Sequence, residues 1–539
     1  MANPSLQIGN SNWAIKEDDL LGYSTVGTNY VPKPITMTRA SLGTRVNPEG
    51  LVEDVALLGS ENIDLTTGSA IKPTDWGSAT TSGISYLATT GTISYYDTGF
   101  SVTSGITYKL SFTLSDYTGS SNLGFSGTGG VSNNAKLEAD GSYSEYFIAS
   151  STAELRLFGR STNTGVFSNV SVKEATIDNL PRVDYTDGTS SLLVEPMRTN
   201  LVTYSEDLTQ WTGLIALSIG LNQGTSPSGL TDANLLSIGI DASATRHRLY
   251  NLFSFVSGDT YTFSMFAKKN EQDWFQLMFS STAFDAQSYA NFDLNNGVVG
   301  NTGTSTTANI IDYGSGWYRC SITCTATASI TTTYEVLTTN NTDSGRYPSY
   351  QSDSNVDVCY LWGAQLEQGS YPTSYIPTSG STVTRNQETY EKTGISNLIN
   401  SEEGVLFLEV AALADDLTYR QISLSDGTSN NRIYLQYNAV SNNIAAVVKV
   451  GGSTTAYTST TLSSSNITDF NKIGFKWKLN DFALWINGVE VSTDTSGGVP
   501  TGLNEFTFNQ TSSDFYGKVK QLQVFKTALS DSELATLTT

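Results

Sequence analysis

The chain has 539 residues, too many for a single hydrophobic core, so three or four domains are expected. Charged residues make up only 15% of it, whereas Gly (47) and Tyr (28) are abundant, a composition typical of many short strands joined by tight turns. The net charge of −22 repels phosphate backbones, and no run of Lys and Arg reverses it locally, which argues against nucleic-acid binding.

Residues 1–55 are predicted to form an irregular leader. Pro32, Pro34 and Pro48 disfavour a continuous helix and keep the backbone extended. The leader also carries apolar side chains, namely Trp13, Leu20, Leu21, Tyr23, Val31 and Ile35. A segment this apolar is expected to pack on a partner or on the next domain. It lacks the basic and apolar regions of a signal peptide, and no apolar run in the chain approaches the ~20 residues of a membrane-spanning helix.

An internal repeat organises the middle of the chain. Residues 100–112 read FSVTSGITYKLSF and residues 253–265 read FSFVSGDTYTFSM, with identical residues at seven of thirteen positions. Each copy predicts a strand, a Ser-Gly turn and a second, alternating strand. Each also follows a tryptophan, Trp76 or Trp211. We therefore expect two related antiparallel β-sandwiches, at about 56–178 and 199–378.

The C-terminal stretch, from about residue 385, has a different pattern. FKWKLNDFALWINGVEVST alternates apolar and polar residues around Asn487-Gly488, which predicts a type I′ hairpin. Alternation places Trp477 in the core. The chain closes with a strand and a short helix, for which Ser530 and Glu533 have capping-box spacing.

Cysteine and histidine residues offer little chemistry. Cys320 and Cys324 are an even number of residues apart, so both are expected on one face of a strand. The third cysteine is Cys359. We expect buried free thiols rather than metal ligands. The one histidine, His247, stands between two arginines without a GxSxG motif nearby, so we expect a surface residue rather than part of a catalytic triad.

Three segments resemble the recurrent phrases of bacteriophage head-fibre, head-spike and tail-fibre proteins. They are TRASLGTRVNPEGLVEDV (38–55), PRVDYTDGTSSLLVEPMRTNLVTYSEDLTQW (181–211) and LWGAQLEQGSYPTSYIPTSGSTVTR (361–385). In such proteins the first two phrases follow one another closely, whereas here about 125 residues, including the first repeat copy, separate them. This departure suggests a duplicated module inserted into the framework. The resemblance implies a virion protein on the exterior of the particle, other virion proteins as partners, and a homotrimer.

The C-terminal part resembles the laminin-G/concanavalin-like sandwich family in FALWINGVEV (482–491) and FYGKVKQLQVFKTALSDSEL (515–534). The resemblance implies two packed antiparallel sheets and, in many relatives, glycan binding. We therefore expect an all-β chain of tandem antiparallel jelly-roll or sandwich domains with a concanavalin-like sandwich at its end. The expected division is a virion-docking leader (1–55), an inserted sandwich (56–178), a second sandwich with framework strands (179–384) and a lectin-like domain (385–539).

Host-glycan contact is expected on loops of this last domain. Aromatic faces stack on sugar rings, and polar side chains bind sugar hydroxyls. Trp485 is out of phase with its core-facing neighbours and is expected to point outward. The candidate carbohydrate-binding residues are Trp485, Asp426, Asn430, Asn431 and Arg432. The alternative is a module that only spaces or decorates the particle.

No cofactor is expected. Calcium is a minor alternative, because Asp184, Asp187, Asp426 and Asn430 offer oxygen ligands on loops, although ordinary Asp-Gly turns explain these residues better. The sequence shows no assembled nucleophile, base or metal site, so we expect a non-enzymatic protein. Two alternatives stay open: a glycan-degrading spike that uses two carboxylates distant in sequence, and a bacterial surface adhesin.

Overall fold

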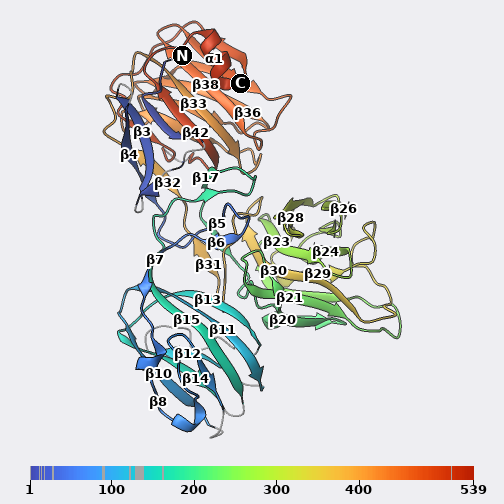
Figure 1. Ribbon diagram of the computed structural model, residues 1–539. Coiled ribbons are helices and arrows are strands. Elements are labelled where there is room, and N and C mark those ends of the chain that lie inside the picture. The colour runs from blue at the N-terminus through green and yellow to red at the C-terminus, as the bar shows by residue number, and fades with distance from the viewer. Residues whose placement is uncertain are drawn as a thin grey trace.

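The protein was analysed as a computed structural model, which describes all residues except 1, 11, 12, 14, 17, 18, 27, 28, 88–91, 120–122, 128–138, 161, 162, 511 and 512. The described chain is almost entirely antiparallel β-structure, and its one α-helix is α1 (Asp531–Thr538). Three β-sandwiches lie around a central junction (Figure 1). The predicted all-β fold of tandem antiparallel sandwiches is confirmed. No helix of the described part is long and apolar enough to cross a membrane.

The first sandwich packs a four-stranded sheet, in the order β12-β14-β10-β8, against a sheet in the order β13-β11-β15-β7, with β9 paired to β15. Its strands are β7 (Leu57–Glu61), β8 (Ser69–Ala70), β9 (Ile84–Tyr86), β10 (Ser94–Val102), β11 (Thr107–Thr118), β12 (Leu123–Gly127), β13 (Gly141–Ile148), β14 (Ala153–Gly159) and β15 (Thr164–Thr176). Alternate side chains of β11, among them Tyr108 and Leu110, enter a separate aromatic-rich core.

The second sandwich has two six-stranded sheets, in the orders β19-β22-β29-β24-β25-β26 and β20-β21-β30-β23-β28-β27. Its strands are β19 (Gly213–Ile215), β20 (Ser218–Thr225), β21 (Thr231–Ile238), β22 (Arg248–Phe255), β23 (Thr260–Lys269), β24 (Trp274–Phe279), β25 (Tyr289–Asp293), β26 (Val298–Thr302), β27 (Thr307–Asp312), β28 (Trp317–Thr325), β29 (Ile330–Thr338) and β30 (Val356–Gln368). Cys320, Cys324 and Cys359 are buried in its core as free thiols, as expected.

The two repeat copies make the same turn. Gly105 and Gly258 both have positive φ (84° and 89°), which the backbone requires between the two strands. Tyr108 accepts a hydrogen bond from the backbone of the residue five positions earlier at 3.0 Å, and Tyr261 does so at 3.2 Å. The strand after each turn is central in its sheet, β11 between β13 and β15, and β23 between β28 and β30. The sequence repeat is thus a structural repeat.

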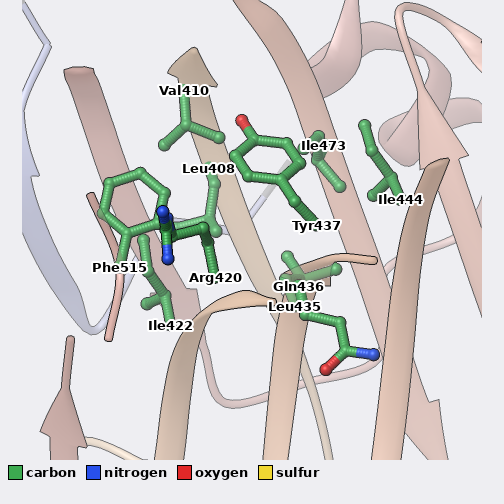
Figure 2. A pocket seen from close by; sticks show the side chains of 10 residues that line it. All are labelled: Leu408, Val410, Arg420, Ile422, Leu435, Gln436, Tyr437, Ile444, Ile473 and Phe515. Carbon is green, nitrogen blue, oxygen red and sulfur yellow. The ribbon is translucent and has the colours of Figure 1, made fainter. Parts of the chain in front are cut away.

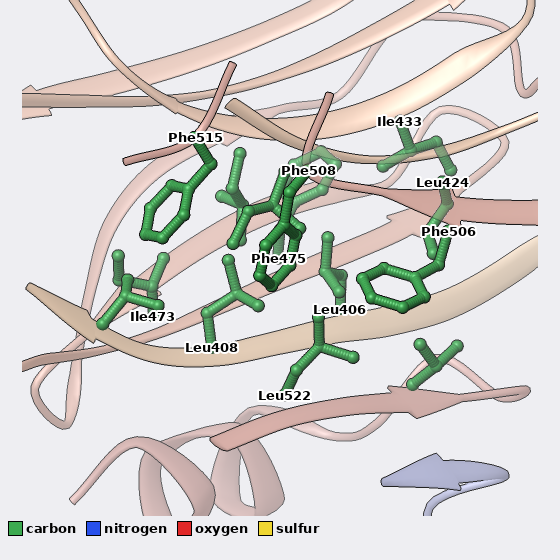
Figure 3. Packing of buried hydrophobic residues seen from close by; sticks show 14 of the residues in the cluster. Leu406, Leu408, Leu424, Ile433, Ile473, Phe475, Phe506, Phe508, Phe515 and Leu522 are labelled. Carbon is green, nitrogen blue, oxygen red and sulfur yellow. The ribbon is translucent and has the colours of Figure 1, made fainter. Parts of the chain in front are cut away.

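The C-terminal sandwich is a continuous ladder of paired strands that curls into a closed, barrel-like sheet. Its C-terminal strands are β32 (Thr389–Lys392), β33 (Glu403–Ala412), β34 (Arg420–Ser425), β35 (Arg432–Tyr437), β36 (Asn443–Val450), β37 (Ser453–Thr461), β38 (Asn471–Lys478), β39 (Phe482–Ile486), β40 (Val489–Asp494), β41 (Glu505–Thr507) and β42 (Gly517–Phe525). Leu406, Leu408, Phe475 and Leu522 interdigitate between its faces (Figure 3).

The leader differs from the predicted irregular docking segment, because most of it belongs to this C-terminal sandwich. Its strands are β1 (Leu6–Gly9), β2 (Ile15–Lys16), β3 (Asp19–Val26) and β4 (Asn29–Thr38). Strand β1 pairs with β42, and β4 pairs with both β3 and β32, so the N-terminus lies beside the C-terminal strands (Figure 1). Leu20 and Ile35, two of the apolar side chains that suggested docking to a partner, instead belong to the C-terminal core, and Trp13 packs against it.

The remaining leader residues form a hairpin of β5 (Thr44–Val46) and β6 (Val52–Asp54) at the junction. Val46 and Val52 pack on an aromatic cluster of the second sandwich that includes Trp317, Trp362 and Tyr375. Three short strands complete the junction. Strand β16 (Val183–Asp184) pairs with β17 (Ser191–Val194), and β17 pairs with β42. Strand β18 (Arg198–Asn200) pairs with β31 (Val383–Arg385).

Candidate functional site

The predicted glycan-binding loop between β34 and β35 is a self-bonded turn. Asp426 accepts hydrogen bonds from the Thr428 amide (2.9 Å) and hydroxyl (2.6 Å) and from Asn431 Nδ2 (2.9 Å). The Asn430 amide donates to the Thr428 hydroxyl at 3.1 Å. The carboxylate and amides predicted to face a sugar are therefore used within the loop, where Asn430 remains exposed. The structure places these residues together in one turn.

Two predicted site residues are buried. Arg432 is 5% exposed. Its guanidinium carbon lies 4.3 Å from the centre of the Tyr434 ring, and its Nη1 donates to Gln421 Oε1 at 3.4 Å. The expectation that Trp485 points outward is wrong, since its side chain is only 8% exposed. Its phase was predicted correctly: Phe482 faces the inter-sheet core and Trp485 faces the opposite side. Helix α1 lies over that side of the sheet (Figure 1), and its Leu534 packs in one cluster with Trp485, which buries the indole.

The interior of the C-terminal sandwich holds no sugar-sized space. A cavity of about 10 Å³ lies between its sheets and is lined by Leu408, Val410, Ile422, Leu435, Tyr437, Ile444, Ile473 and Phe515, with Arg420 and Gln436 also contributing (Figure 2). This volume suits one water molecule at most. This cavity is therefore too small to hold a sugar.

A larger groove, of about 440 Å³, lies between the second and the C-terminal sandwich. One wall comes from β23, β27 and β28 and from the residues around them, and the other from the loop between β33 and β34. The lining residues are Thr260, Ser305, Thr307, Thr323, Cys324, Thr325, Ser370, Ala414, Asp415 and Asp416. Its volume falls in the usual range of small-molecule sites, roughly 300–1,000 Å³.

The sandwich wall of the groove is a ladder of hydroxyl groups. Thr260 and Thr325 face each other across β23 and β28, with their hydroxyl oxygens 2.9 Å apart, and Thr307 pairs with Thr323 across β27 and β28. Residues two apart on one strand share a face, so Thr323 and Thr325 both point into the groove. Each hydroxyl both donates and accepts hydrogen bonds, which matches the hydroxyl groups of a sugar.

The opposite wall is acidic. Asp415 accepts hydrogen bonds from Ser441 Oγ (2.5 Å) and the Asn442 amide (3.1 Å) through one oxygen. Asp416 forms an ion pair of 2.9 Å with Arg420. The loop that carries them exposes Leu417, a bulky residue with positive φ (59°), and Tyr419, each about half exposed at 52% and 50%. A positive φ is strained for leucine, and Tyr419 offers an accessible ring on the same loop.

The chemistry of the groove favours binding over catalysis. Its lining has hydroxyls and two carboxylates but no Lys, Arg or His, so it suits a neutral, hydroxylated ligand. Burial raises the pKa of the Cys324 thiol to about 11, which keeps it protonated and a poor nucleophile near pH 7. The carboxylates are adjacent in sequence on one wall, and one is ion-paired, whereas hydrolysis of a glycosidic bond uses carboxyl groups that flank the bond.

A buried network of charges holds the two sandwiches together. Glu388 accepts from Arg39 Nη1 at 2.6 Å and from Arg182 Nε and Nη2 at 2.7 and 2.6 Å. Glu195 pairs with Arg182 at 2.8 Å and with Arg385 at 2.9 Å. All five side chains are essentially inaccessible to solvent. We call these five residues the ion network.

Charge pairing outweighs burial at the two carboxylates of the ion network, Glu195 and Glu388, whose pKa values are both lowered, whereas burial outweighs pairing at Arg39 and Arg385. Burial alone would raise the pKa of Glu195, but Arg385 and Arg182, together with bonds from Ser374, lower it to about 2. Ser374 donates from its amide (2.8 Å) and hydroxyl (2.7 Å) to Glu195. It lies four residues after Ser370, which lines the groove. Sequence analysis missed these residues, although four of the five lie in the three quoted phage-like segments.

His247 is buried, contrary to the expected surface position. Its Nε2 lies 2.8 Å from Asp241 Oδ2, and its ring packs 4.7 Å from the Tyr350 ring. Asp241 also accepts from the Ser352 amide at 2.9 Å. No serine or cysteine nucleophile completes a triad among these contacts, and the pair ties two loops of the second sandwich together.

The calcium candidates lie apart. Asp184 accepts from the Val46 amide (2.9 Å) and the Thr186 amide (3.0 Å), and Asp187 pairs with Lys518 at 2.5 Å. Asp426 and Asn430 lie in the β34–β35 loop. Among the described residues, no group of three or more His, Cys, Asp or Glu side chains is placed to hold a metal ion.

One pair of carboxyl groups has raised pKa values. Burial, and then the charge of Asp232, raises the pKa of Glu206 to about 8, and burial raises that of Asp232 to about 6. Glu206 accepts a hydrogen bond of 2.8 Å from Tyr375, which belongs to the aromatic cluster under the β5–β6 hairpin. Neither carboxyl group lines the groove, so we assign them to the packing of the junction.

This pair predicts that stability falls as pH rises. Glu206 stays protonated in the folded protein up to about pH 8, whereas in the unfolded chain it ionises near pH 4.3. Between these values the folded state binds more protons, so its stability decreases with rising pH, by up to about 1.4 kcal/mol per pH unit for each proton. We expect the thermal midpoint to drop between pH 5.5 and 8. Glu206→Gln should flatten this dependence, whereas Glu402→Gln, at an exposed carboxyl, should preserve it; equal slopes in both variants would contradict the assignment.

Comparisons with known proteins add little. No protein-family model matches the chain, and no curated protein matches its sequence. Among similar solved structures is the CBM40 of the Ruminococcus gnavus IT-sialidase bound to alpha2,3 sialyllactose, with 16% identity over 26% of this chain and 84% of that chain and a TM-score of 0.23. A second structure of that CBM40 shows 15% identity over 28% of this chain and 98% of that chain, with a TM-score of 0.24. At these TM-scores the likeness carries no argument.

Proposed function

We propose that this chain is a non-enzymatic component of a bacteriophage virion, a fibre or spike on the head or tail that contacts host surface glycans. The observation that carries the proposal is the convergence of the three phage-like segments on the ion network. Arg39 comes from the first segment, Arg182 and Glu195 from the second, and Arg385 from the third. Segments that recur together for one structural purpose are expected to meet in space, and these do.

The ion network suits a protein that displays modules rigidly. It joins the C-terminal sandwich, through β4 and β32, to the second sandwich, through the segment after β30. A buried pair that lost one member would leave an unpaired charge, so the arrangement resists partial opening. A fixed geometry between modules lowers the entropy lost when a ligand bridges them.

Glycan contact is proposed at the groove rather than at the β34–β35 loop. The hydroxyl ladder of Thr260, Thr323 and Thr325 supplies hydrogen bonds, and Tyr419 supplies an exposed ring on the loop that carries Asp415 and Asp416. Aromatic rings that stack on sugars, combined with convergent polar groups, are the usual means of binding neutral sugars. The partners in this proposal are other virion proteins, further copies of the chain in a homotrimer, and a host glycan.

Groove variants test the glycan contact. Thr323→Val and Thr325→Val together keep shape and strand propensity but remove two hydroxyls. Since a hydrogen bond contributes about 0.5–1.5 kcal/mol, the double variant should bind host-cell surface polysaccharide about tenfold more weakly, as measured with the purified full chain. Thr331→Val is the matched control, because it removes an exposed hydroxyl of the other sheet that pairs with Ser254. Equal binding by all three proteins would refute groove binding.

Virion membership is tested separately. Antibodies against the full chain should label intact particles at a fixed position on the exterior, by immunogold electron microscopy. Labelling would also place the protein on the head or the tail. Particles that carry no label while the chain is abundant in the lysate would overturn the proposal.

A further inference from the structure

Three arginine side chains surround one tyrosine on the second sandwich. The guanidinium carbons of Arg246, Arg248 and Arg346 lie 4.2, 5.3 and 5.7 Å from the centre of the Tyr347 ring. In a chain of net charge −22, these arginines form a local region of positive charge. No run of basic residues in the sequence predicted it, because Arg346 comes from a loop distant from Arg246 and Arg248. We call Arg246, Arg346 and Tyr347 the Tyr347 patch.

The positive charge of the patch is only partly neutralised. Arg248 is paired with Glu335: its Nη1 donates hydrogen bonds to both carboxylate oxygens, at 3.1 and 3.0 Å. Among the described residues, neither Arg246 nor Arg346 has a carboxylate within ion-pair distance, and Arg246 is exposed. Burial lowers the pKa of the Arg346 guanidinium, despite the opposing charges of Glu335 and the more distant Asp285. Three arginines against these two carboxylates leave the patch positive.

Tyr347 is held in a strained conformation. Its φ is +66°, a region that costs a bulky residue about 1–3 kcal/mol unless the surroundings enforce it. Gln276, which is fully buried, accepts a hydrogen bond from the Tyr347 amide (2.9 Å) and donates to Gly345 (3.0 Å). The ring also packs on Met278 and Leu337. The loop segment 345–347 is therefore anchored on the sheet through Gln276, Met278 and Leu337.

We infer that the Tyr347 patch binds the carboxylate group of an acidic sugar residue. The planar guanidinium group of the exposed Arg246 matches the geometry of a carboxylate, which it binds with paired hydrogen bonds. Arg346, whose Nη2 donates to the Phe279 carbonyl at 2.9 Å, adds positive charge beside it. The acidic surface elsewhere repels polyanions with closely spaced charges, whereas screening beyond about 8 Å lets isolated carboxylates approach. A glycan whose acidic residues alternate with neutral ones fits both conditions. The site is distinct from the groove, whose lining has no cation.

Titration calorimetry with the full-length protein tests this inference. The probe is an oligosaccharide in which glucuronic acid alternates with a neutral sugar, and its control is the same oligosaccharide with the carboxyls reduced to alcohols. We expect binding of the first only. Arg246→Gln with Arg346→Gln should weaken it at least about tenfold, the loss of about 1.4 kcal/mol. Arg160→Gln, at an exposed arginine of the first sandwich, should not.

The outcomes separate the site from its alternatives. Equal binding by the reduced oligosaccharide, no binding by the parent protein, or equal binding by the double variant would each overturn the inference. Inorganic phosphate that competes as well as free glucuronate would overturn the assignment to carboxylates. If the double variant misfolds, Arg246→Gln alone serves, because that side chain is exposed. The groove variants do not alter the patch, so either proposal can fail without the other.

Discussion

Replacing Glu388 with glutamine is expected to lower the free energy of unfolding by about 3–5 kcal/mol, the usual effect of removing one member of a buried ion pair. Glu388 accepts from Arg39 and Arg182, which are both fully buried. The substitution preserves shape but leaves these two guanidinium groups without their carboxylate. The change should appear as a lower midpoint of the main transition in urea.

The control for this prediction is Glu391→Gln. This carboxyl group lies three residues further along, on the exposed side of β32, so its loss should change stability by less than about 0.5 kcal/mol. Similar midpoints for the two variants would mean that the ion network contributes no more than surface charges. In that case the junction would depend on apolar packing beneath the β5–β6 hairpin.

Local patterns were sufficient to predict the fold class and several elements. The repeat predicted two equivalent turns at Gly105 and Gly258, and Asn487 and Gly488 both have the positive φ of the predicted type I′ hairpin. The Ser530 amide bonds the Glu533 side chain at 3.0 Å, as the capping-box spacing predicted. Each of these features depends on residues close together in sequence, whose backbone preferences act before tertiary contacts form.

Features that join distant segments were not predictable in the same way. The Ser5 amide donates to Val524, a pair separated by more than five hundred residues, and apolar alternation in β1 does not specify this partner. The phase of Trp485 was correct, but the sequence could not show that α1 would cover it. A hydrophobic pattern indicates which side chains share a face, and tertiary packing decides whether that face is exposed.

The candidate sites show the same limit. The groove takes one wall from threonines on β28 and the other from Asp415 and Asp416, about ninety residues later. The one local feature of the sequence that pointed to the groove was the spacing of Thr323 and Thr325, which are two residues apart on a predicted strand and therefore share a face. The loop around Asp426 looked like a binding loop because its residue types suit ligands, yet the same types also satisfy a turn.

The isolated fragment 385–539 is expected not to fold. It lacks β1 and β17, which pair with the edge of β42, and β3 and β4, of which β4 pairs with β32; all four supply part of the core. The missing core residues are Leu6, Ile8, Leu20, Ile35, Met37, Leu192 and Val194. Without them, an apolar strand edge and the inner face of the sheet are open to other chains. We expect the fragment to aggregate and to show no cooperative thermal transition.

A fused chain provides the matched comparison. Asn386 Nδ2 donates to the Ala40 carbonyl at 3.0 Å, so residues 1–40 can be joined to 386–539 by a short Gly-Ser linker without distortion. This chain regains β1, β3 and β4, and we expect it to be soluble with a cooperative transition in circular dichroism. A fragment 385–539 that is monomeric and melts at the same temperature would show that the N-terminal strands are dispensable. If instead only the fused chain folds, residues 1–37 are part of the C-terminal core. Deleting them from the full protein would then cause misfolding. Any resulting loss of particle attachment would follow from that misfolding rather than from a missing docking segment.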